Sequence, residues 1–282
     1  YFIASGIISE AIVGRIVAIA NQKGGVGKTT TCINLAASMA ATKRKVLVVD
    51  LDPQGNATMA SGVDKYQVEA TAYDLLVEDT SFDEVVCRST SGNYDLIAAN
   101  GDVTAAEIKL MEVFAREVRL KSALASVRDN YDFIFIDCPP SLHLLTINAM
   151  AAADSVLVPM QCEYFALEGL TALMDTISKL AAVVNENLKI EGLLRTMYDP
   201  RNSLTNDVSS QLTKHFGDKV YTTVIPRNVR LAEAPSYGLP ALAYDKNSRG
   251  AMSYLALAGE INRRTNSKKR AVKNTQASSQ TA

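Results

Sequence analysis

The chain has 282 residues, of which 48% are hydrophobic and 21% charged, so its composition is that of an ordinary globular protein. No apolar run approaches the roughly 18 residues needed to cross a bilayer, and the two histidines and four cysteines are too scattered for a zinc-type ligand cluster. The formal net charge is −1, but six of the 29 basic residues and none of the 30 acidic residues lie from Arg263 onward. The sequence therefore combines an acidic body with a basic C-terminal tail.

Short β-type runs alternate with helical stretches along the chain, a pattern that predicts a parallel sheet covered by helices on both faces. Most of the runs are continuously apolar, as expected for strands buried on both faces. The predicted strands are Ile16–Ala20, Val46–Asp50, Leu96–Ala98, Phe133–Asp137, Ser155–Pro159, Glu191–Thr196 and Val220–Val224. The predicted helices are Thr31–Ala41, Ala105–Asn130, Leu144–Ala153, Ala166–Asn185 and Ser203–Phe216. We therefore expect an α/β fold with a mostly parallel, doubly wound sheet.

One domain, residues 15–264, accounts for this pattern, and two terminal segments lie outside it. Residues 1–14 form an extension of uncertain order, which is apolar but lacks the basic region that opens a signal peptide. Residues 265–282 are polar, basic and rich in Ser, Gln and Thr, which predicts a disordered tail. The cysteines form no C-x-x-C pair and indicate reduced thiols, as in a cytosolic protein.

A glycine-rich loop joins the first predicted strand to the first predicted helix. In such a loop the backbone N–H groups and the positive end of the helix dipole bind a polyphosphate. Lys28 adds a mobile positive charge, and Thr29 adds a hydroxyl ligand for magnesium. The residues expected at the phosphates are Lys23, Gly24, Gly25, Val26, Gly27, Lys28, Thr29 and Thr30.

Two predicted strands end in carboxylates, at the edge where such sheets bind nucleotides. Asp50 and Asp52 follow one apolar run, and Asp137 ends another. A carboxylate at position 137 can hold magnesium opposite the Thr29 hydroxyl, usually through water. Asp50 is expected to assist through magnesium-bound water. The predicted metal site is therefore Thr29, Asp50 and Asp137.

The loop departs from the usual pattern G-x-x-x-x-G-K-[ST], because Gln22 stands where that pattern has glycine and Lys23 is an additional lysine. With the doubled threonine at 29 and 30, it resembles the deviant Walker A motif shared by ParA/Soj partition ATPases, MinD and nitrogenase iron protein. Residues 161–169, 196–199 and 224–236 also resemble chromosomal ParA/Soj sequence. The resemblance to the ParA/Soj family covers roughly residues 15–262.

This resemblance implies a magnesium-dependent ATP hydrolase of the cytoplasm, associated with the nucleoid, with weak intrinsic activity. Its ATP-bound homodimer is expected to bind DNA without sequence preference, and a ParB-type centromere-binding partner to stimulate hydrolysis. Lys28 would contact its own nucleotide, Lys23 would cross the two-fold interface to the partner's nucleotide, and Asp52 would orient the attacking water. By the same resemblance the base is held by Met197, Pro226, Arg227 and Asn228, and DNA is bound by Arg201 and Arg230.

Four alternatives compete with this interpretation. One is a pure DNA-binding regulator, but no helix-turn-helix pattern is found ahead of Arg15. A MinD-like division-site ATPase would need a C-terminal amphipathic helix, but the only sizeable apolar residue after Ile261 is Val272, so no membrane binding is expected. A nitrogenase-like iron protein would need paired cluster cysteines, and Cys138 has no second cysteine in a matching context. A metabolic P-loop enzyme, such as an amidoligase, stays open. Its ATP turnover would depend on a small substrate rather than on DNA and a partition partner.

Overall fold

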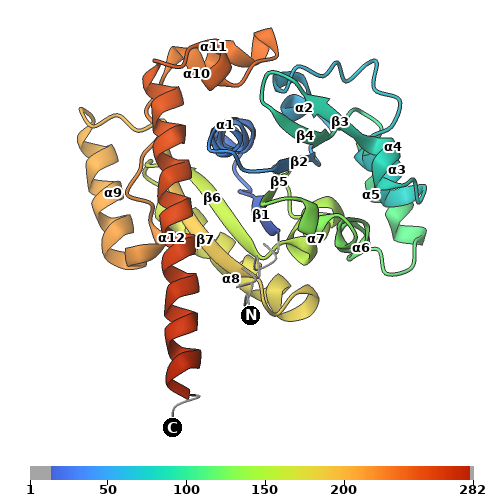
Figure 1. The fold of residues 1–282 in the computed structure, drawn as a ribbon. Helices are drawn as coiled ribbons and strands as arrows, with labels where there is room; N and C mark the ends of the chain where they lie inside the picture. The colour runs from blue at the N-terminus through green and yellow to red at the C-terminus, as the bar shows by residue number, and fades with distance from the viewer. Residues whose placement is uncertain (1–13, 280–282) are drawn as a thin grey trace, which may run out of the picture.

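The computed structural model describes residues 14–279, with side chains as far as residue 265. Seven strands in the described part of the chain form one sheet in the order β3-β4-β2-β5-β1-β6-β7 (Figure 1). Neighbouring strands are parallel except β3 and β4, which are antiparallel. The strands are β1 (Arg15–Ile19), β2 (Val46–Asp50), β3 (Val86–Ser89), β4 (Tyr94–Ile97), β5 (Phe133–Asp137), β6 (Ser155–Gln161) and β7 (Lys189–Thr196).

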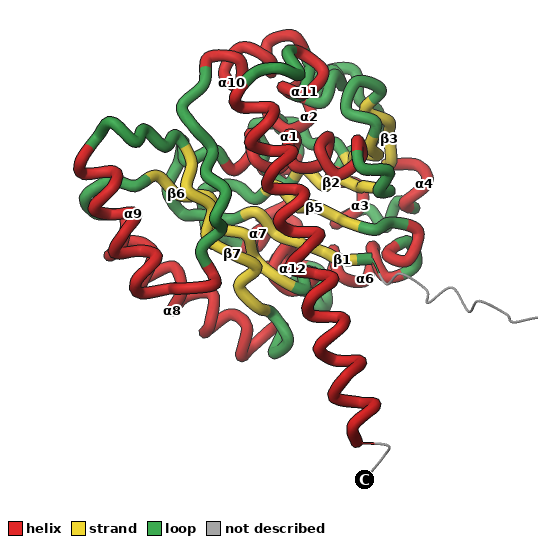
Figure 2. The backbone as a smooth tube through the Cα atoms, turned by 60° about the vertical axis from the view of Figure 1, so that its left-hand side comes forward, coloured by secondary structure: helices red, strands yellow, loops and turns green. Residues whose placement is uncertain are grey.

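Helices cover both faces of this sheet (Figure 2). The α-helices are α1 (Lys28–Ala41), α2 (Asn56–Ala60), α3 (Ala72–Val77), α4 (Phe82–Val85), α5 (Val103–Lys109), α6 (Arg119–Ala125), α7 (Leu144–Ala152), α8 (Ala166–Val184), α9 (Ser203–Phe216), α10 (Val229–Glu233), α11 (Ala241–Tyr244) and α12 (Arg249–Ser279). Short 3₁₀ turns follow several of them, at Leu110–Glu112, Arg128–Asn130, Gly217–Lys219 and Ala234–Tyr237.

The apolar core consists of two layers, one on each face of the sheet. Val17 and Val48 pack with α1 and α12, whereas Ile16 and Leu47 pack with α3, α5, α6, α7 and α8. Adjacent strand residues therefore serve opposite layers, because successive side chains of a strand point to opposite faces. The predicted α/β class with a doubly wound, mostly parallel sheet is confirmed.

The carboxyl ends of three central strands meet at one edge of the sheet. In the register of the ladder Asp137 lies beside Ile19 on one side and beside Asp50 on the other. The loop that leaves β1 and the turn that leaves β2 therefore start next to the end of β5. This register brings together segments that are far apart in the sequence.

The predicted strand Val220–Val224 is wrong. Only Val220 forms a β-bridge, to Leu193. The N–H groups of Thr222 and Thr223 instead donate to the two carboxylate oxygens of Glu260, each at 2.9 Å. A carboxylate from α12 thus takes the donors that a strand would need for its ladder.

The prediction of one helix over Ala105–Asn130 is also wrong, because α5 ends at Lys109 and α6 begins only at Arg119. Asn148 of α7 stabilises the break, since its side chain donates to the carbonyl of Arg116 at 2.7 Å and accepts from the N–H of Leu120 at 3.1 Å. The sequence analysis also missed β3, which pairs with β4 through a turn where Asn93 has a left-handed φ of 57°.

The two terminal segments differ in what the structure describes. Residues 1–13 of the predicted extension lie outside the described residues. At the other end α12 continues to Ser279, so the backbone of residues 265–279 is helical where the sequence predicts disorder. Lys, Arg, Ala and Gln all have good helix propensity, so a polar composition does not by itself exclude a helix. No helix of the described chain is long and apolar enough to cross a membrane.

Candidate active site

The glycine-rich loop of residues 23–27, called the phosphate loop from here on, is held in place by hydrogen bonds from two neighbouring strands. Gly27 ends the loop with a left-handed φ of 88°, and α1 begins at Lys28. The Thr196 hydroxyl donates to the carbonyl of Val26 at 2.8 Å, and the Gln161 amide donates to the carbonyl of Gly25 at 3.1 Å. These bonds from β7 and β6 hold the loop beside the N-terminus of α1, where backbone N–H groups face an anion.

Lys28 is turned into this loop. Its side chain is buried, and its Nζ donates to the carbonyl of Lys23 at 3.2 Å. Burial lowers the pKa of Lys28, while the nearby carboxylates Asp137 and Asp52 act to raise it. A buried cation is costly unless an anion accompanies it, so this ammonium group is suited to a bound phosphate.

Thr29 and Asp137 face each other at the floor of the site. The Thr29 hydroxyl donates to Asp137 Oδ2 at 2.7 Å, while Asp137 Oδ1 is buried and has no hydrogen-bond partner among the residues that the structure describes. Burial, together with the neighbouring Asp50, raises the pKa of Asp137 well above its usual range. An orphaned buried carboxylate oxygen is unfavourable, and a divalent cation would satisfy it.

These two side chains fit magnesium, which prefers hard oxygen ligands and keeps several waters. Among the described residues no group of three or more His, Cys, Asp or Glu could hold a metal ion.

Asp50 is occupied by hydrogen bonds within the chain. Its Oδ1 accepts from the N–H of Asp52 at 3.1 Å, and its Oδ2 accepts from the N–H and the hydroxyl of Thr58 at 2.9 and 2.8 Å. Burial raises its pKa to about 6, although the bonds from Thr58 and Asp52 act in the opposite direction. Its assignment to the metal site stays a prediction.

Asp52 lies in the turn after β2 and is 9% exposed. Its Oδ1 accepts from the N–H of Gln54 at 3.0 Å. Within the described residues no hydrogen bond reaches Oδ2. One oxygen of Asp52 is therefore left to accept from a water molecule.

Lys23 has a different environment from Lys28. Its side chain is 60% exposed, and its ammonium group forms an ion pair with Glu163, which follows β6. The backbone N–H of Lys23 donates to Asn21 Oδ1 at 3.0 Å. The structure thus directs the extra lysine to the surface of its own chain.

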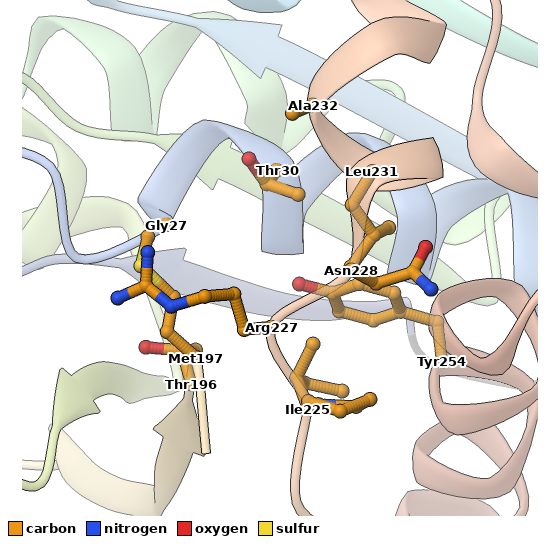
Figure 3. A pocket seen from close by; sticks show the side chains of 11 residues that line it. Gly27, Thr30, Thr196, Met197, Ile225, Arg227, Asn228, Leu231, Ala232 and Tyr254 are labelled. Carbon is orange, nitrogen blue, oxygen red and sulfur yellow. The ribbon is translucent and has the colours of Figure 1, made fainter. Parts of the chain in front are cut away.

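A pocket of about 190 Å³ lies beside the phosphate loop (Figure 3). The four residues predicted to hold the base, Met197, Pro226, Arg227 and Asn228, all line it, together with Thr30. Gly27 of the loop also lines it, and the remaining lining residues were not predicted: Thr196, Ile225, Leu231, Ala232 and Tyr254. The first four lie in the segments 196–199 and 224–236 that resemble ParA/Soj sequence, whereas Tyr254 lies outside every segment singled out from the sequence. Tyr254 reaches it from α12, and its hydroxyl lies 3.1 Å from that of Thr31.

Arg201 and Arg230 are exposed and both are paired with carboxylates of their own chain. Arg201 forms two hydrogen bonds with Asp199, at 2.9 and 2.8 Å. Arg230 contacts Glu233 at 2.8 Å and Asp245 at 3.5 Å. The assignment of the two arginines to DNA binding stays a prediction.

Comparison with known proteins places these features in a family. The chain matches the family model described as an AAA domain over residues 14–190. It is 54% identical to the sporulation initiation inhibitor protein Soj of Bacillus subtilis, covering 88% of this chain and 98% of the relative. It is 49% identical to the chromosome partitioning protein ParA of Caulobacter vibrioides, covering 88% of this chain and 93% of the relative.

Two solved structures are also similar. One is a cobyrinic acid a,c-diamide synthase of Mycobacterium smegmatis with bound ATP analog and magnesium: 36% identity, TM-score 0.79, covering 91% of this chain and 97% of that one. The other is the septum site-determining protein MinD of Pyrococcus horikoshii complexed with Mg-ADP: 28% identity, TM-score 0.74, covering 88% and 96%. Both carry the fold described above, and both contain magnesium with an adenine nucleotide or its analog.

Proposed function

The chain belongs to the ParA/Soj family of chromosome-partitioning ATPases, and on this premise we propose that it is a DNA-partitioning ATPase acting at the nucleoid. In this proposal ATP and magnesium bind at the phosphate loop. The ATP-bound chain forms a two-fold sandwich dimer that binds DNA without sequence preference. Hydrolysis, stimulated by a ParB-type partner, returns the chain to the free state.

The observation that carries this proposal is that the two lysines of one loop lie in different environments. Lys28 is buried and donates to the carbonyl of Lys23, whereas the side chain of Lys23 is 60% exposed and pairs with Glu163. This exposure leaves the Lys23 ammonium group accessible to a nucleotide bound by a second chain. A dimer in which each Lys23 contacts the partner's nucleotide gives it a role like that of an arginine finger supplied in trans.

The ion pair with Glu163 does not oppose such a contact strongly. Both side chains are more than half exposed, and an exposed pair contributes only about 0–1 kcal/mol. Exchanging Glu163 for the phosphates of a second nucleotide is therefore favourable, because a phosphate carries more charge and the dimer interface excludes water. ATP then acts as the signal for dimerisation.

Phosphoryl transfer requires charge neutralisation and a water molecule in line with the bond that breaks. Lys28 neutralises charge on the β- and γ-phosphates, and Asp52 accepts a hydrogen bond from the attacking water. Thr29 and Asp137 would hold the magnesium ion, which would supply charge neutralisation at the phosphate oxygens. Asp50 is proposed to assist through magnesium-bound water, and it also holds the turn that carries Asp52, since it accepts from the N–H of Asp52.

The solved structures support adenine as the base held in the base pocket. The two solved structures described above contain an ATP analog or ADP with magnesium. The pocket beside the phosphate loop, which Asn228 lines, is where we place the base. We therefore assign the nucleotide as ATP.

DNA co-sedimentation with ATP, with ADP and without nucleotide tests this function. The protein should sediment with DNA only in ATP and magnesium, and the bound fraction should fall steeply as salt rises, because the contacts go to phosphates. ATP turnover should rise when DNA and a ParB-type partner are both present. Retention on DNA that does not depend on the nucleotide would contradict the switch.

A second candidate function comes from the solved diamide synthase, which is 36% identical to this chain. An amidoligase would also use a phosphate loop and magnesium, but its turnover would require a small carboxylic acid and an amide donor. The higher identity of 54% and 49% to Soj and ParA favours partitioning. Turnover that ignores DNA and depends on a small acid would favour the ligase instead.

A further inference from the structure

The turn from β2 to α2 carries Asp52 and has an unusual helix cap. Gly55, the N-cap of α2, has a left-handed φ of 60° and no side chain with which to cap the helix. The first N–H groups of a helix need acceptors from outside it. Asp50 supplies one from the end of β2, since its Oδ2 accepts from the N–H of Thr58 at 2.9 Å.

Thr58 connects this cap to the segment that follows β4. It is completely buried, and its hydroxyl donates to Asp50 Oδ2 at 2.8 Å while accepting from the N–H of Ala99 at 2.9 Å. Asp50 in turn accepts from the N–H of Asp52 through its other oxygen. A continuous series of hydrogen bonds thus runs from Ala99, after β4, through Thr58 and Asp50 to the backbone of Asp52.

The turn is also confined on the side of β4. A Cβ built on Gly55 would lie 2.5 Å from the carbonyl oxygen of Ala99 and 2.9 Å from the side chain of Lys65. The backbone therefore packs directly on residue 99 at this point. The close contact of Gly55 with Ala99 prevents the turn from moving nearer to residue 99. The hydrogen bond from the N–H of Ala99 to the Thr58 hydroxyl opposes movement away from it.

We propose that Thr58 is a positioning residue for ATP hydrolysis: its buried hydroxyl holds Asp50 against α2 and Ala99, and so fixes the direction in which Asp52 presents its free oxygen to water. This inference rests on the hydrolytic role proposed for Asp52. Among the described residues, the hydrogen bond to the Asp52 carboxylate comes from the N–H of Gln54 within the same turn, so the path of this turn sets the direction of the carboxylate. A displacement of about 1 Å at a catalytic group can cost roughly 100-fold in rate.

The sharpest test compares Thr58→Ala with Thr58→Ser, which both lose the methyl group and differ only in the hydroxyl. We expect kcat for ATP hydrolysis to be at least about tenfold lower in Thr58→Ala than in Thr58→Ser, with KM and ATP affinity within about twofold. The ATP-bound dimer should accumulate in Thr58→Ala, as measured by light scattering. Equal kcat values in the two variants would overturn the proposal.

Thr71 provides a matched control. It is also buried, caps a helix, and donates from its hydroxyl to a carboxylate, that of Asp74, at 3.1 Å. It makes no hydrogen bond with residues 50–58. Thr71→Ala and Thr71→Ser should differ in melting temperature but not in kcat. A drop in kcat of the same size in Thr71→Ala would show that Thr58 acts only through stability.

Asp52→Ala, measured alongside, separates failure of the inference from failure of the function. If Asp52→Ala hydrolyses ATP normally, the proposed role of Asp52 is wrong and Thr58 has nothing to position. If Asp52→Ala is slow while Thr58→Ala is not, only the inference fails. Should Thr58→Ala not fold, Thr58→Val, which retains the volume of the side chain and loses the hydroxyl, takes its place.

Discussion

The residues of the phosphate loop show how environment assigns different tasks to one side-chain type. Lys23 and Lys28 belong to the same loop, yet one ammonium group is largely solvated and the other is buried near carboxylates. The buried lysine is suited to a phosphate held by its own chain. The exposed lysine can exchange its ion pair with Glu163 for a contact outside the chain.

Replacing Lys23 with alanine should abolish dimerisation in ATP and leave nucleotide binding to the monomer nearly unchanged. The reason is that Lys28, Thr29 and the loop amides remain in place. Light scattering with ATP and magnesium measures the dimer, and fluorescent-nucleotide titration measures binding. Lys45→Ala, at the opposite end of β2, serves as the control and should dimerise normally. A dimer that still forms in Lys23→Ala would contradict the proposed contact of Lys23 with the nucleotide of the second chain.

Replacing Asp52 with alanine should slow ATP hydrolysis by roughly 100-fold, because the attacking water loses its acceptor. ATP binding should persist, so the variant should accumulate as an ATP-bound dimer on DNA. A single-turnover hydrolysis assay and co-sedimentation measure the two effects. Normal turnover in this variant would refute the role assigned to Asp52.

Among the elements, α12 contributes Tyr254 to the pocket proposed for the base and also shapes the segment that leads to this pocket. Glu260, on this helix, accepts from the N–H groups of Thr222 and Thr223 and from Arg264 at 2.7 Å. These bonds hold the segment before Ile225 out of the sheet and lead it toward the pocket. Burial raises the pKa of Glu260, but the backbone donors and Arg264 outweigh it, so the pKa lies below its usual range.

Glu260→Gln should destabilise the protein by about 1–3 kcal/mol at pH 7, because a charged acceptor of three hydrogen bonds is removed. A carboxyl whose pKa is lowered by folding stabilises the protein above its unfolded pKa, 4.5, and this contribution disappears as pH falls through the lower folded pKa. The difference between wild type and variant should therefore shrink below pH 4.5. Urea unfolding at several pH values measures it, with the exposed Glu186→Gln as control. A difference that grows with acid would contradict the assignment.

At the scale of the whole molecule, the proposed DNA binding has to occur on a chain with a formal net charge of −1 whose two candidate arginines already pair with carboxylates. Arg201 and Arg230 both contact carboxylates of their own chain. Arg201 also shares a pocket of about 330 Å³ with Arg227 and Arg249, next to the base pocket. The proposed dimer would double these groups on one assembly, so the proposed nucleotide-dependent DNA binding would be a property of the pair of chains.

Arg230→Glu should weaken DNA binding in ATP at every sequence tested, because the arginine is proposed to bind phosphate. The slope of log affinity against log salt should become shallower by about one for each phosphate that the variant no longer neutralises. Arg88→Glu, which removes an arginine paired with Asp95 of β4, is the control. Unchanged salt-sensitive affinity in Arg230→Glu would show that another surface binds DNA.

The parts of the fold that were predictable depend on neighbours in sequence. Val46–Asp50 and Phe133–Asp137 have the predicted bounds, because a continuous apolar run ended by aspartate marks a strand buried on both faces. Val220–Val224 consists of β-branched and aromatic residues, which also predicts a strand, but the segment is not a strand. Its N–H groups are taken by Glu260, 38 residues away along the chain, and no local pattern reveals that partner.

The sequence by itself determined the phosphate loop and the carboxylates at the strand ends, because loop chemistry and strand termination are local and recur at fixed spacing. The tertiary structure decided which distant side chains complete the site. Glu163 pairs with Lys23 from 140 residues away, and Tyr254 reaches Thr31 across 223 residues. Such contacts follow from the strand order and from the packing of α12 on α1, which arise only when the whole sheet is assembled.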